Sequence, residues 1–344
     1  MHIYLTAILW EMGIYMESRK VQETGGATYI VSLPKKWVRD TGIKKKDTIN
    51  MLILPDGTLS LYPTKETEKK ERKKVFEVSE EKPEHLLRKL IGAYIAGYEV
   101  IEVRAKHKLN REIRDAVRRF TQTVIGPEIV DETISSVSTK DLLNPSDLPF
   151  DTSIRRMFYI VRGMHENAIL ALVERDHPLC EDVKSRDQEV DKLNWLIARQ
   201  YNMLLTDSSF CGKMKMTRDS GLVYVLISRI LERVGDHATK ISYFIPYINS
   251  KIDKSLLEGI ENIGKLSIEL LDNSMDSFFK KNIKEANVHI DEVEILFEKC
   301  DSLMGKIASI KNAKNVALSQ IIESIRRTGA YARDIAEMTI NYSI

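Results

Sequence analysis

An internal repeat constrains the C-terminal half of this chain more than any other feature. A frame of Arg-x-Gly, followed by Ala and Ile, occurs twice at a separation of about 94 residues. The matching residues are Arg233 and Arg327, Gly235 and Gly329, Ala238 and Ala332, and Ile241 and Ile335. A tandem repeat of this length predicts two units of the same design packed against each other.

The repeated units are predicted to be helical. From Ser153 onward, apolar residues such as Ile154, Met157 and Val161 keep the spacing of one helix face. We expect six long helices, near residues 152–175, 180–205, 217–245, 253–281, 284–309 and 314–342. They form an all-α domain over 150–344, with three-helix repeats at about 152–248 and 252–342.

The N-terminal part of the chain predicts strands instead. Residues 27–33, 48–54 and 58–62 are rich in β-branched and aromatic side chains, and Asp56-Gly57 predicts a hairpin turn between the last two strands. Residues 34–41 begin with proline and end before Gly42, as a short helix does. We therefore expect a small β domain over 17–63.

A charged linker and a mixed unit separate these two domains. Residues 64–74 are almost wholly charged and predict a solvated linker. Strands and helices then alternate over 75–149, which predicts a small α/β unit. This unit contains no Walker loop or nucleotide-binding glycine fingerprint, and we expect its helices to make interdomain or dimer contacts.

Composition limits the classes of protein to consider. The chain of 344 residues is 43% hydrophobic and 30% charged, which is typical of globular domains, and its net charge is only +2. Three widely spaced cysteines indicate a reducing compartment. Residues 1–16 are apolar but are interrupted by Glu11 and lack a basic start, so we expect neither a signal peptide nor a membrane span. Met16 is a candidate start of translation, and the expected location is cytoplasmic.

Four acidic residues form two pairs at helical spacing. Asp187 and Asp191 lie four residues apart in the second predicted helix, and Glu232 and Asp236 do so in the third. Each pair projects from one helix face. If the two faces meet, four carboxylates must bind a cation or stay partly protonated, because their repulsion is severe. Alone, either pair is more often a solvated face. Gly235 beside them predicts a close approach of another helix.

These motifs resemble the PhoU family over roughly residues 150–344. The DxxxD motif of 187–191 and the segment ERVGDHATKI of 232–241 are similar to the paired E/DxxxD motifs with which that family binds iron or similar metals. The resemblance implies a cluster of iron, manganese or magnesium, held by Asp187, Asp191, Glu232 and Asp236. His237 is expected to be a neighbour of the site and not a ligand.

The second repeat departs from this pattern. Arg326 and Ala330 stand where the first repeat has Glu232 and Asp236. In our alignment, Asn287 and Asp291 correspond to Asp187 and Asp191, so three of the four ligand positions are lost. We therefore expect one metal site, in the first repeat.

Residues 18–63 resemble the SpoVT/AbrB family of swapped-hairpin DNA-binding domains. The resemblance rests on Gly25, Leu33-Pro34, Trp37, Gly42-Ile43, Asp47 and Asp56-Gly57. It implies a small swapped-hairpin β-barrel that is complete only as a homodimer. By position in the family, the implied DNA contacts are Arg19, Lys20, Lys35, Lys36 and Arg39. Basic side chains in such a cluster suit phosphate backbones. Some members of the family bind protein partners such as toxins.

A chain that joins the two domains resembles archaeal phosphate-uptake regulators. This combination implies a DNA-binding dimer that controls phosphate homeostasis, with the helical domain as a metal-bearing sensor or docking module. The alternative is an adaptor that does not bind DNA and contacts a phosphate transporter ATPase or a sensor kinase. An enzyme is disfavoured, because carboxylate-bridged di-metal oxidases use Glu-x-x-His pairs and Val234 stands three residues before His237.

Overall fold

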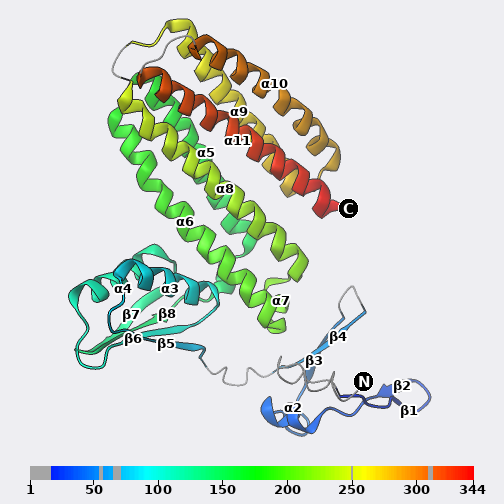
Figure 1. Ribbon diagram of the computed structural model, residues 1–344. Coiled ribbons are helices and arrows are strands. Elements are labelled where there is room, and N and C mark those ends of the chain that lie inside the picture. The colour runs from blue at the N-terminus through cyan, green and yellow to red at the C-terminus, as the bar shows by residue number, and fades with distance from the viewer. Residues whose placement is uncertain (1–16, 54–56, 65–70, 249–250, 309–312) are drawn as a thin grey trace, which may run out of the picture. The chain divides into compact units, whose positions relative to one another are not determined.

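A computed structural model describes residues 17–53, 57–64, 71–248, 251–308 and 313–344 (Figure 1). The candidate start at Met16, part of the predicted hairpin turn and most of the charged linker lie outside these residues. The chain divides into two compact units, Met1–Lys70 and Glu71–Ile344. Among the described residues, no helix is both long and apolar enough to cross a membrane.

The N-terminal unit consists of two separate hairpins and a short helix. Its elements are β1 (Gln22–Thr24), β2 (Thr28–Ile30), α2 (Lys35–Asp40), β3 (Ile49–Ile53) and β4 (Leu59–Pro63). β1 pairs with β2 and β3 with β4, both antiparallel, and they form two sheets of two strands each. Gly25 and Gly26 connect β1 to β2 with φ angles of 65° and 77°, a region that favours glycine. The strands and the helix follow the sequence prediction, although β1 was not predicted as a separate strand.

The described part of this unit has no core of its own. None of its described residues is buried. Tyr29 and Ile53 are 74% and 76% exposed, although both lie in strands. Met51 and Ile53 pair with Leu61 and Leu59 across the β3–β4 hairpin, so all four share one apolar face. The burial within these described residues offsets little of the entropy of ordering them.

The middle unit is a four-stranded sheet with two helices on one face (Figure 1). Its elements are β5 (Lys73–Glu77), α3 (Pro83–Ile95), β6 (Val100–Arg104), α4 (Arg111–Thr123), β7 (Pro127–Glu132) and β8 (Ser136–Asp141). The strand order is β5-β6-β8-β7, with β5 parallel to β6 and the other pairs antiparallel. Ile101, Val103 and Val137 pack against the helices in the core. On the other face, Glu102 forms ion pairs with Lys73 and Arg104.

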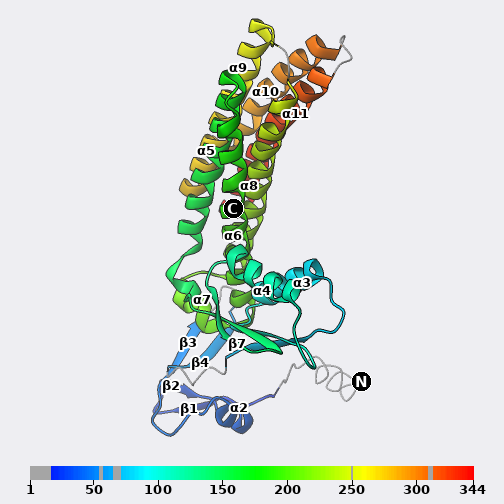
Figure 2. The ribbon, with the colours of Figure 1, turned by 90° about the vertical axis from the view of Figure 1, so that its left-hand side faces the viewer.

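Six long helices form the bundle, as predicted, and one short helix was not predicted (Figure 2). The first repeat contains α5 (Phe150–Glu174), α6 (His177–Thr206), the short α7 (Ser208–Met214) and α8 (Arg218–Phe244). The second contains α9 (Lys254–Lys280), α10 (Ile283–Ala308) and α11 (Ala313–Ser343). The long helices of each repeat pack against one another. Across the repeats, α8 packs against α11 and α5 against α9, so equivalent helices meet at the seam.

A buried arginine joins the bundle to the middle unit. Arg199 of α6 is 1% exposed and forms an ion pair with Asp141 at 2.8 Å. It also donates to the carbonyl oxygens of Tyr94 and Tyr98, the latter at 2.9 Å, and its guanidinium lies over the Tyr94 ring. Helix α6 therefore carries both the predicted ligands Asp187 and Asp191 and the residue that fixes the α/β unit.

Candidate functional site

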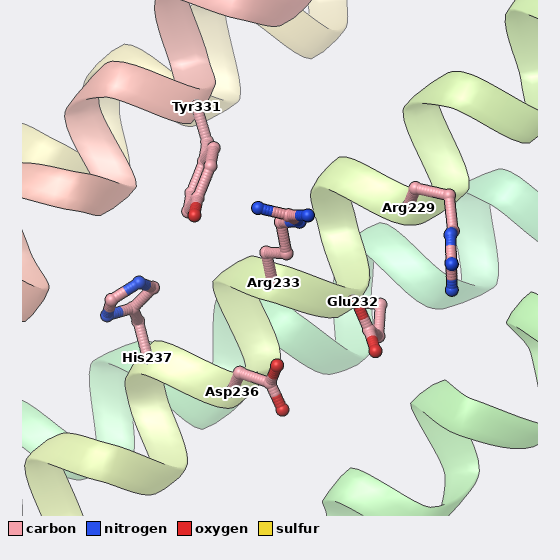
Figure 3. Close-up of a pocket in the computed structure, with 6 residues that line it drawn as sticks. All are labelled: Arg229, Glu232, Arg233, Asp236, His237 and Tyr331. Carbon is pink, nitrogen blue, oxygen red and sulfur yellow. The ribbon is translucent and has the colours of Figure 1, made fainter.

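The structure brings the four predicted carboxylates to the contact between two helices. Asp187 and Asp191 lie on α6, Glu232 and Asp236 lie on α8, and the two helices pack together. The helices lie close here, because a Cβ atom at Gly235 of α8 would lie 3.4 Å from Asp187 Oδ1 of α6. Glu232 and Asp236 direct their carboxylates to the side of α8 away from Tyr331 (Figure 3). The charges of Glu232 and Asp236 act on Asp191, so the two pairs lie near each other across the contact of α6 and α8.

Burial and neighbouring carboxylates both make the ionised forms of these side chains less favourable. Burial raises the pKa of Asp191 to about 6, with further contributions from Asp187, Glu232 and Asp236. Burial also raises the pKa of Asp187, Glu232 and Asp236, and Asp236 adds to the effect at the first two. None of the four forms an ion pair or hydrogen bond with another described residue. A cation would relieve this repulsion.

The donor set fits a hard cation, but the side chains do not yet form a coordination shell. Carboxylate oxygens are the ligands that magnesium and manganese prefer. Among the described residues, however, no three His, Cys, Asp or Glu side chains stand close enough to hold one metal ion.

The second repeat corrects one detail of the sequence alignment. Gly235 packs against Asp187 and Val190 of α6, whereas a Cβ atom on the equivalent Gly329 would meet Leu296 of α10 at 2.2 Å. Leu296 therefore takes the place of Val190, and both stand equally far from the start of their helices. The expected match of Asn287 and Asp291 to Asp187 and Asp191 is wrong. The physical reason is α7, which lengthens the connection between α6 and α8 in the first repeat only.

With this register, Val293 and Phe297 take the places of Asp187 and Asp191. Phe297 lies between two arginines of α11, with Arg326 at 4.9 Å and Arg333 at 5.2 Å from its ring centroid. Each arginine also pairs with an acid of α10, Asp301 or Glu294, at 2.8 Å. In the second repeat, cation–aromatic contacts and ion pairs thus connect the helices where the first repeat has four carboxylates.

A pocket of about 380 Å³ adjoins the carboxylates at the seam between α8 and α11. Its lining residues are Arg229, Glu232, Arg233, Asp236, His237 and Tyr331 (Figure 3). Arg233 extends toward the hydroxyl of Tyr331 (Figure 3), and the centroids of the His237 and Tyr331 rings lie 5.7 Å apart. His237 is thus a neighbour of the carboxylates. Burial lowers its pKa to about 4, and its Nδ1 has no hydrogen-bond partner.

Sequence reasoning did not identify Arg229, Arg233 and Tyr331 as members of a site. One signal was available in the repeat, because His237 and Tyr331 occupy equivalent positions in its two copies. Equivalent residues can meet where equivalent helices pack against each other. Only the fold shows that they do.

The predicted DNA-binding residues fall into two groups. Lys35 and Arg39 are exposed on α2 and line one hollow together with Lys44, above the apolar side chains of Leu33, Val38 and Ile43. Lys36 is exposed on the same helix. Arg19 and Lys20 are exposed before β1, where Arg19 pairs with Glu17. No described hydrogen bond or ion pair joins Arg19 or Lys20 to α2.

Comparison with known families agrees with this architecture. Residues 154–245 match the family model of the PhoU domain. Residues 22–69 match that of MazE, a bacterial antitoxin that recognises a toxin. The first of these segments contains all four carboxylates, and the second contains α2 and both hairpins.

Individual proteins are similar over parts of the chain. A phosphate-specific transport system accessory protein PhoU homolog of Clostridium acetobutylicum is 24% identical over 185 residues, covering 49% of this chain and 80% of that protein. PhoU homolog 1 of Thermotoga maritima is 30% identical over 110 residues, covering 32% of this chain and 45% of that protein. The crystal structure of PhoU from Streptococcus pneumoniae is 18% identical, with a TM-score of 0.48, and covers 56% of this chain and 91% of that structure.

The fold and the site define a tandem-repeat helical-bundle protein with a carboxylate cluster in its first repeat and a coreless β unit at its N-terminal end. More specifically, residues 154–245 are similar to the PhoU domain and are followed by a second helical repeat, and residues 22–69 are similar to the MazE antitoxin domain.

Proposed function

We propose that this protein is a cytoplasmic, DNA-binding regulator of phosphate uptake whose PhoU domain holds a metal cluster and responds to phosphate status. The observation that carries the DNA-binding part is the coreless β unit, which exposes Lys35, Lys36 and Arg39 on one short helix. The link to phosphate rests on the PhoU domain and on its relatives, which are named as accessory proteins of phosphate-specific transport.

A homodimer is part of this proposal, because two copies of the β unit can cover each other's apolar strands. Basic residues from two copies then form one continuous surface for a phosphate backbone. The physical link to the bundle is α6, which runs from Asp187 and Asp191 to Arg199 at the α/β unit. A change in the carboxylate cluster that moves α6 would therefore reach the α/β unit.

Genome-wide DNA occupancy in phosphate-rich and phosphate-poor cells tests the proposal most directly. We expect enrichment at promoters of phosphate-uptake genes that differs between the two conditions, and loss of this enrichment in Lys35→Gln/Arg39→Gln. Arg156→Gln on α5 is the matched control, because it removes an exposed cation elsewhere. Absence of enrichment in both conditions would favour the adaptor, in which the β unit only dimerises and the bundle contacts a transporter ATPase or another regulatory protein.

Salt dependence in vitro tests the proposed contact residues. Arg19→Ala/Arg39→Ala should weaken DNA binding and flatten the plot of log affinity against log salt, by about 0.9 per lost phosphate contact in each bound copy. If the double variant binds like the parent over the whole salt series, these side chains do not contact DNA.

Elemental analysis tests the metal site. Asp187, Asp191, Glu232 and Asp236 would hold iron, manganese or magnesium, and the cation would neutralise charges that now repel one another. We expect Asp191→Asn/Asp236→Asn to lose the metal after gentle purification while keeping its helicity. Asp291→Asn is the control, because Asp291 is exposed on α10 away from the site. Retention of metal by the first variant and its loss from the control would refute the assignment.

A further inference from the structure

Strand β5, at one edge of the four-stranded sheet, carries backbone groups that its own sheet does not use (Figure 1). The parallel ladder with β6 begins where Val100 N–H donates to Arg72 O at 3.2 Å. Because the backbone of a strand alternates in direction, every second residue from Arg72 onward bonds to β6. The residues between them direct their N–H and C=O groups away from β6. We call these the outer-edge residues; they are Lys73, Val75 and Glu77.

This edge of β5 is uncovered in the described part of the chain. Among the described elements, β6 alone packs closely against β5. No described hydrogen bond uses the N–H or C=O groups of the outer-edge residues. Such a row of unpaired groups is a template for another strand. Neither a proline nor a bulge interrupts β5, so a partner strand has only the charges of its side chains to match.

The side chains of β5 are complementary to a second copy of the same strand. Lys73 and Glu77 lie at equal distances in sequence on either side of Val75. If two copies pair antiparallel about a twofold axis at Val75, Lys73 of each copy lies opposite Glu77 of the other, which is a favourable cross-strand pair. Both side chains are exposed, and Glu77 forms no ion pair with another described residue. The charges at this edge therefore match themselves.

Backbone and charges select the same register for this pairing. With the axis at Val75, outer-edge residues of the two copies lie opposite each other and can exchange hydrogen bonds. A shift of one residue would set them opposite Lys74 and Phe76, whose backbone groups bond to β6. A shift of two residues would either place Glu77 opposite Glu71 of the second copy, a like-charge pair, or separate Lys73 from Glu77.

We propose that β5 pairs with β5 of a second copy, antiparallel and centred on Val75, so that the two α/β units share one continuous sheet. This inference rests on the proposed homodimer of the N-terminal unit, because five residues at an edge associate weakly by themselves. The chain from Pro63 to Lys73 spans at most about 36 Å when fully extended, so the N-terminal contact would hold two β5 strands at a high effective concentration. Arg199 fixes α6 to the α/β unit, and the shared sheet would therefore also link the two bundles.

Disulfide trapping in the full-length protein tests the proposal. Opposite residues that exchange hydrogen bonds in an antiparallel pair have Cα atoms about 5.5 Å apart, which a disulfide can bridge. Under mild oxidation, we expect Val75→Cys to form a disulfide-linked dimer roughly tenfold faster than Val130→Cys. Val130 is 52% exposed on β7, at the opposite edge of the sheet, and controls for random collisions. The parent protein gives the background from its own cysteines. Equal rates in the two variants would overturn the proposal.

Charge reversal tests the register. Glu77→Lys in the Val75→Cys protein would place lysines opposite each other, so it should slow disulfide formation by about fivefold at low salt, and Glu77→Gln should slow it less. Lys73 is left unchanged, because it pairs with Glu102 of its own chain. An unchanged rate in Glu77→Lys would show that Lys73 and Glu77 do not lie opposite each other, and would overturn the proposed pairing.

Hydrogen exchange separates this contact from the N-terminal one and needs no change in β5. The Val75 amide has no acceptor among the described residues of its own chain. In the parent dimer it should exchange roughly tenfold more slowly than in Ile53→Glu, which disrupts the N-terminal contact. A dimeric parent with an unprotected Val75 amide would overturn the β5 contact alone. Full protection in Ile53→Glu would overturn its dependence on the N-terminal dimer, and a monomeric parent would overturn both contacts.

Discussion

Asp191 shows how one half-buried carboxylate couples stability to pH. Its pKa of about 6 lies above the ordinary value of 3.8, so the folded state favours its protonated form. This preference stabilises the fold at low pH and is lost as the pH rises through the folded pKa. At neutral pH without metal, the charged Asp191 destabilises the bundle.

Asp191→Asn should therefore stabilise the metal-free protein near neutral pH. We expect a gain in unfolding free energy of about 1 kcal/mol at about pH 7.5, a value reduced for partial solvent screening, and little change near pH 4. Urea unfolding of the chelator-treated parent and variant at the two pH values measures this difference in unfolding free energy. Asp291→Asn, an exposed change on α10, should give no such difference. A loss of stability at neutral pH would mean that Asp191 makes a favourable interaction as an anion.

Arg199 is the residue on which attachment of the α/β unit depends. Its partner Asp141 is 4% exposed, and Arg199→Met would leave this carboxylate buried without a cation. We expect a cost of about 3–5 kcal/mol, because an unpaired buried charge is strongly destabilising. Adding Asp141→Asn to Arg199→Met should recover a large part of the lost stability. Urea unfolding of both single variants and the double variant measures the coupling, and additive losses would argue against a shared interaction.

At the scale of helices, the two equivalent glycines Gly235 and Gly329 should respond in opposite ways to alanine. A Cβ atom on Gly235 meets its neighbours at 3.4–3.6 Å, an ordinary contact, so Gly235→Ala should gain up to about 1 kcal/mol of helix propensity. On Gly329 the same atom would overlap Leu296, which is fully buried. Overpacking of about 1–3 kcal/mol should make Gly329→Ala neutral or destabilising. Thermal unfolding compares the stabilities of the two alanine variants. A larger gain in stability for Gly329→Ala than for Gly235→Ala would contradict the assigned packing.

The sequence predicted the six long helices and most of the short elements, including α2, but missed β1 and α7, for physical reasons. A helix of many turns repeats its apolar spacing often enough to be recognised, as α5 and α8 do. The short α7 presents too few turns for that. Because α7 was not predicted, α10 was aligned with α6 in the wrong register. The Arg-x-Gly motif aligns α8 with α11, but it does not show that the connection from α6 to α8 is longer than the one from α10 to α11.

The sequence predicted only those parts of the candidate site whose residues lie on the same helix. Spacing alone placed Asp187 with Asp191 and Glu232 with Asp236. Tyr331 enters the seam pocket through the contact of two helices about 94 residues apart in sequence, which periodicity does not encode. Tertiary packing of the repeats decides which equivalent residues meet.

For the whole molecule, the exposed strands of the N-terminal unit determine the expected oligomeric state. Met51, Ile53, Leu59 and Leu61 form one apolar face of the β3–β4 hairpin, and nothing in the described part of this unit buries it. Isolated two-stranded hairpins are marginally stable in water, and a second copy is the cover that we propose for this face. We therefore predict that the full-length protein is a dimer at micromolar concentration, as measured by size-exclusion chromatography with light scattering.

Ile53→Glu should shift this dimer toward monomer, because it places a charge within the apolar face that we propose the second copy covers. Ile295→Glu is the matched control, since Ile295 is also exposed but lies on α10. DNA binding should fall together with dimerisation in Ile53→Glu and stay unchanged in the control, because each copy supplies only half of the basic surface. A parent protein that is monomeric at micromolar concentration would contradict the prediction. So would an Ile53→Glu variant that dimerises like its parent, because the β3–β4 face would then not form the contact between copies.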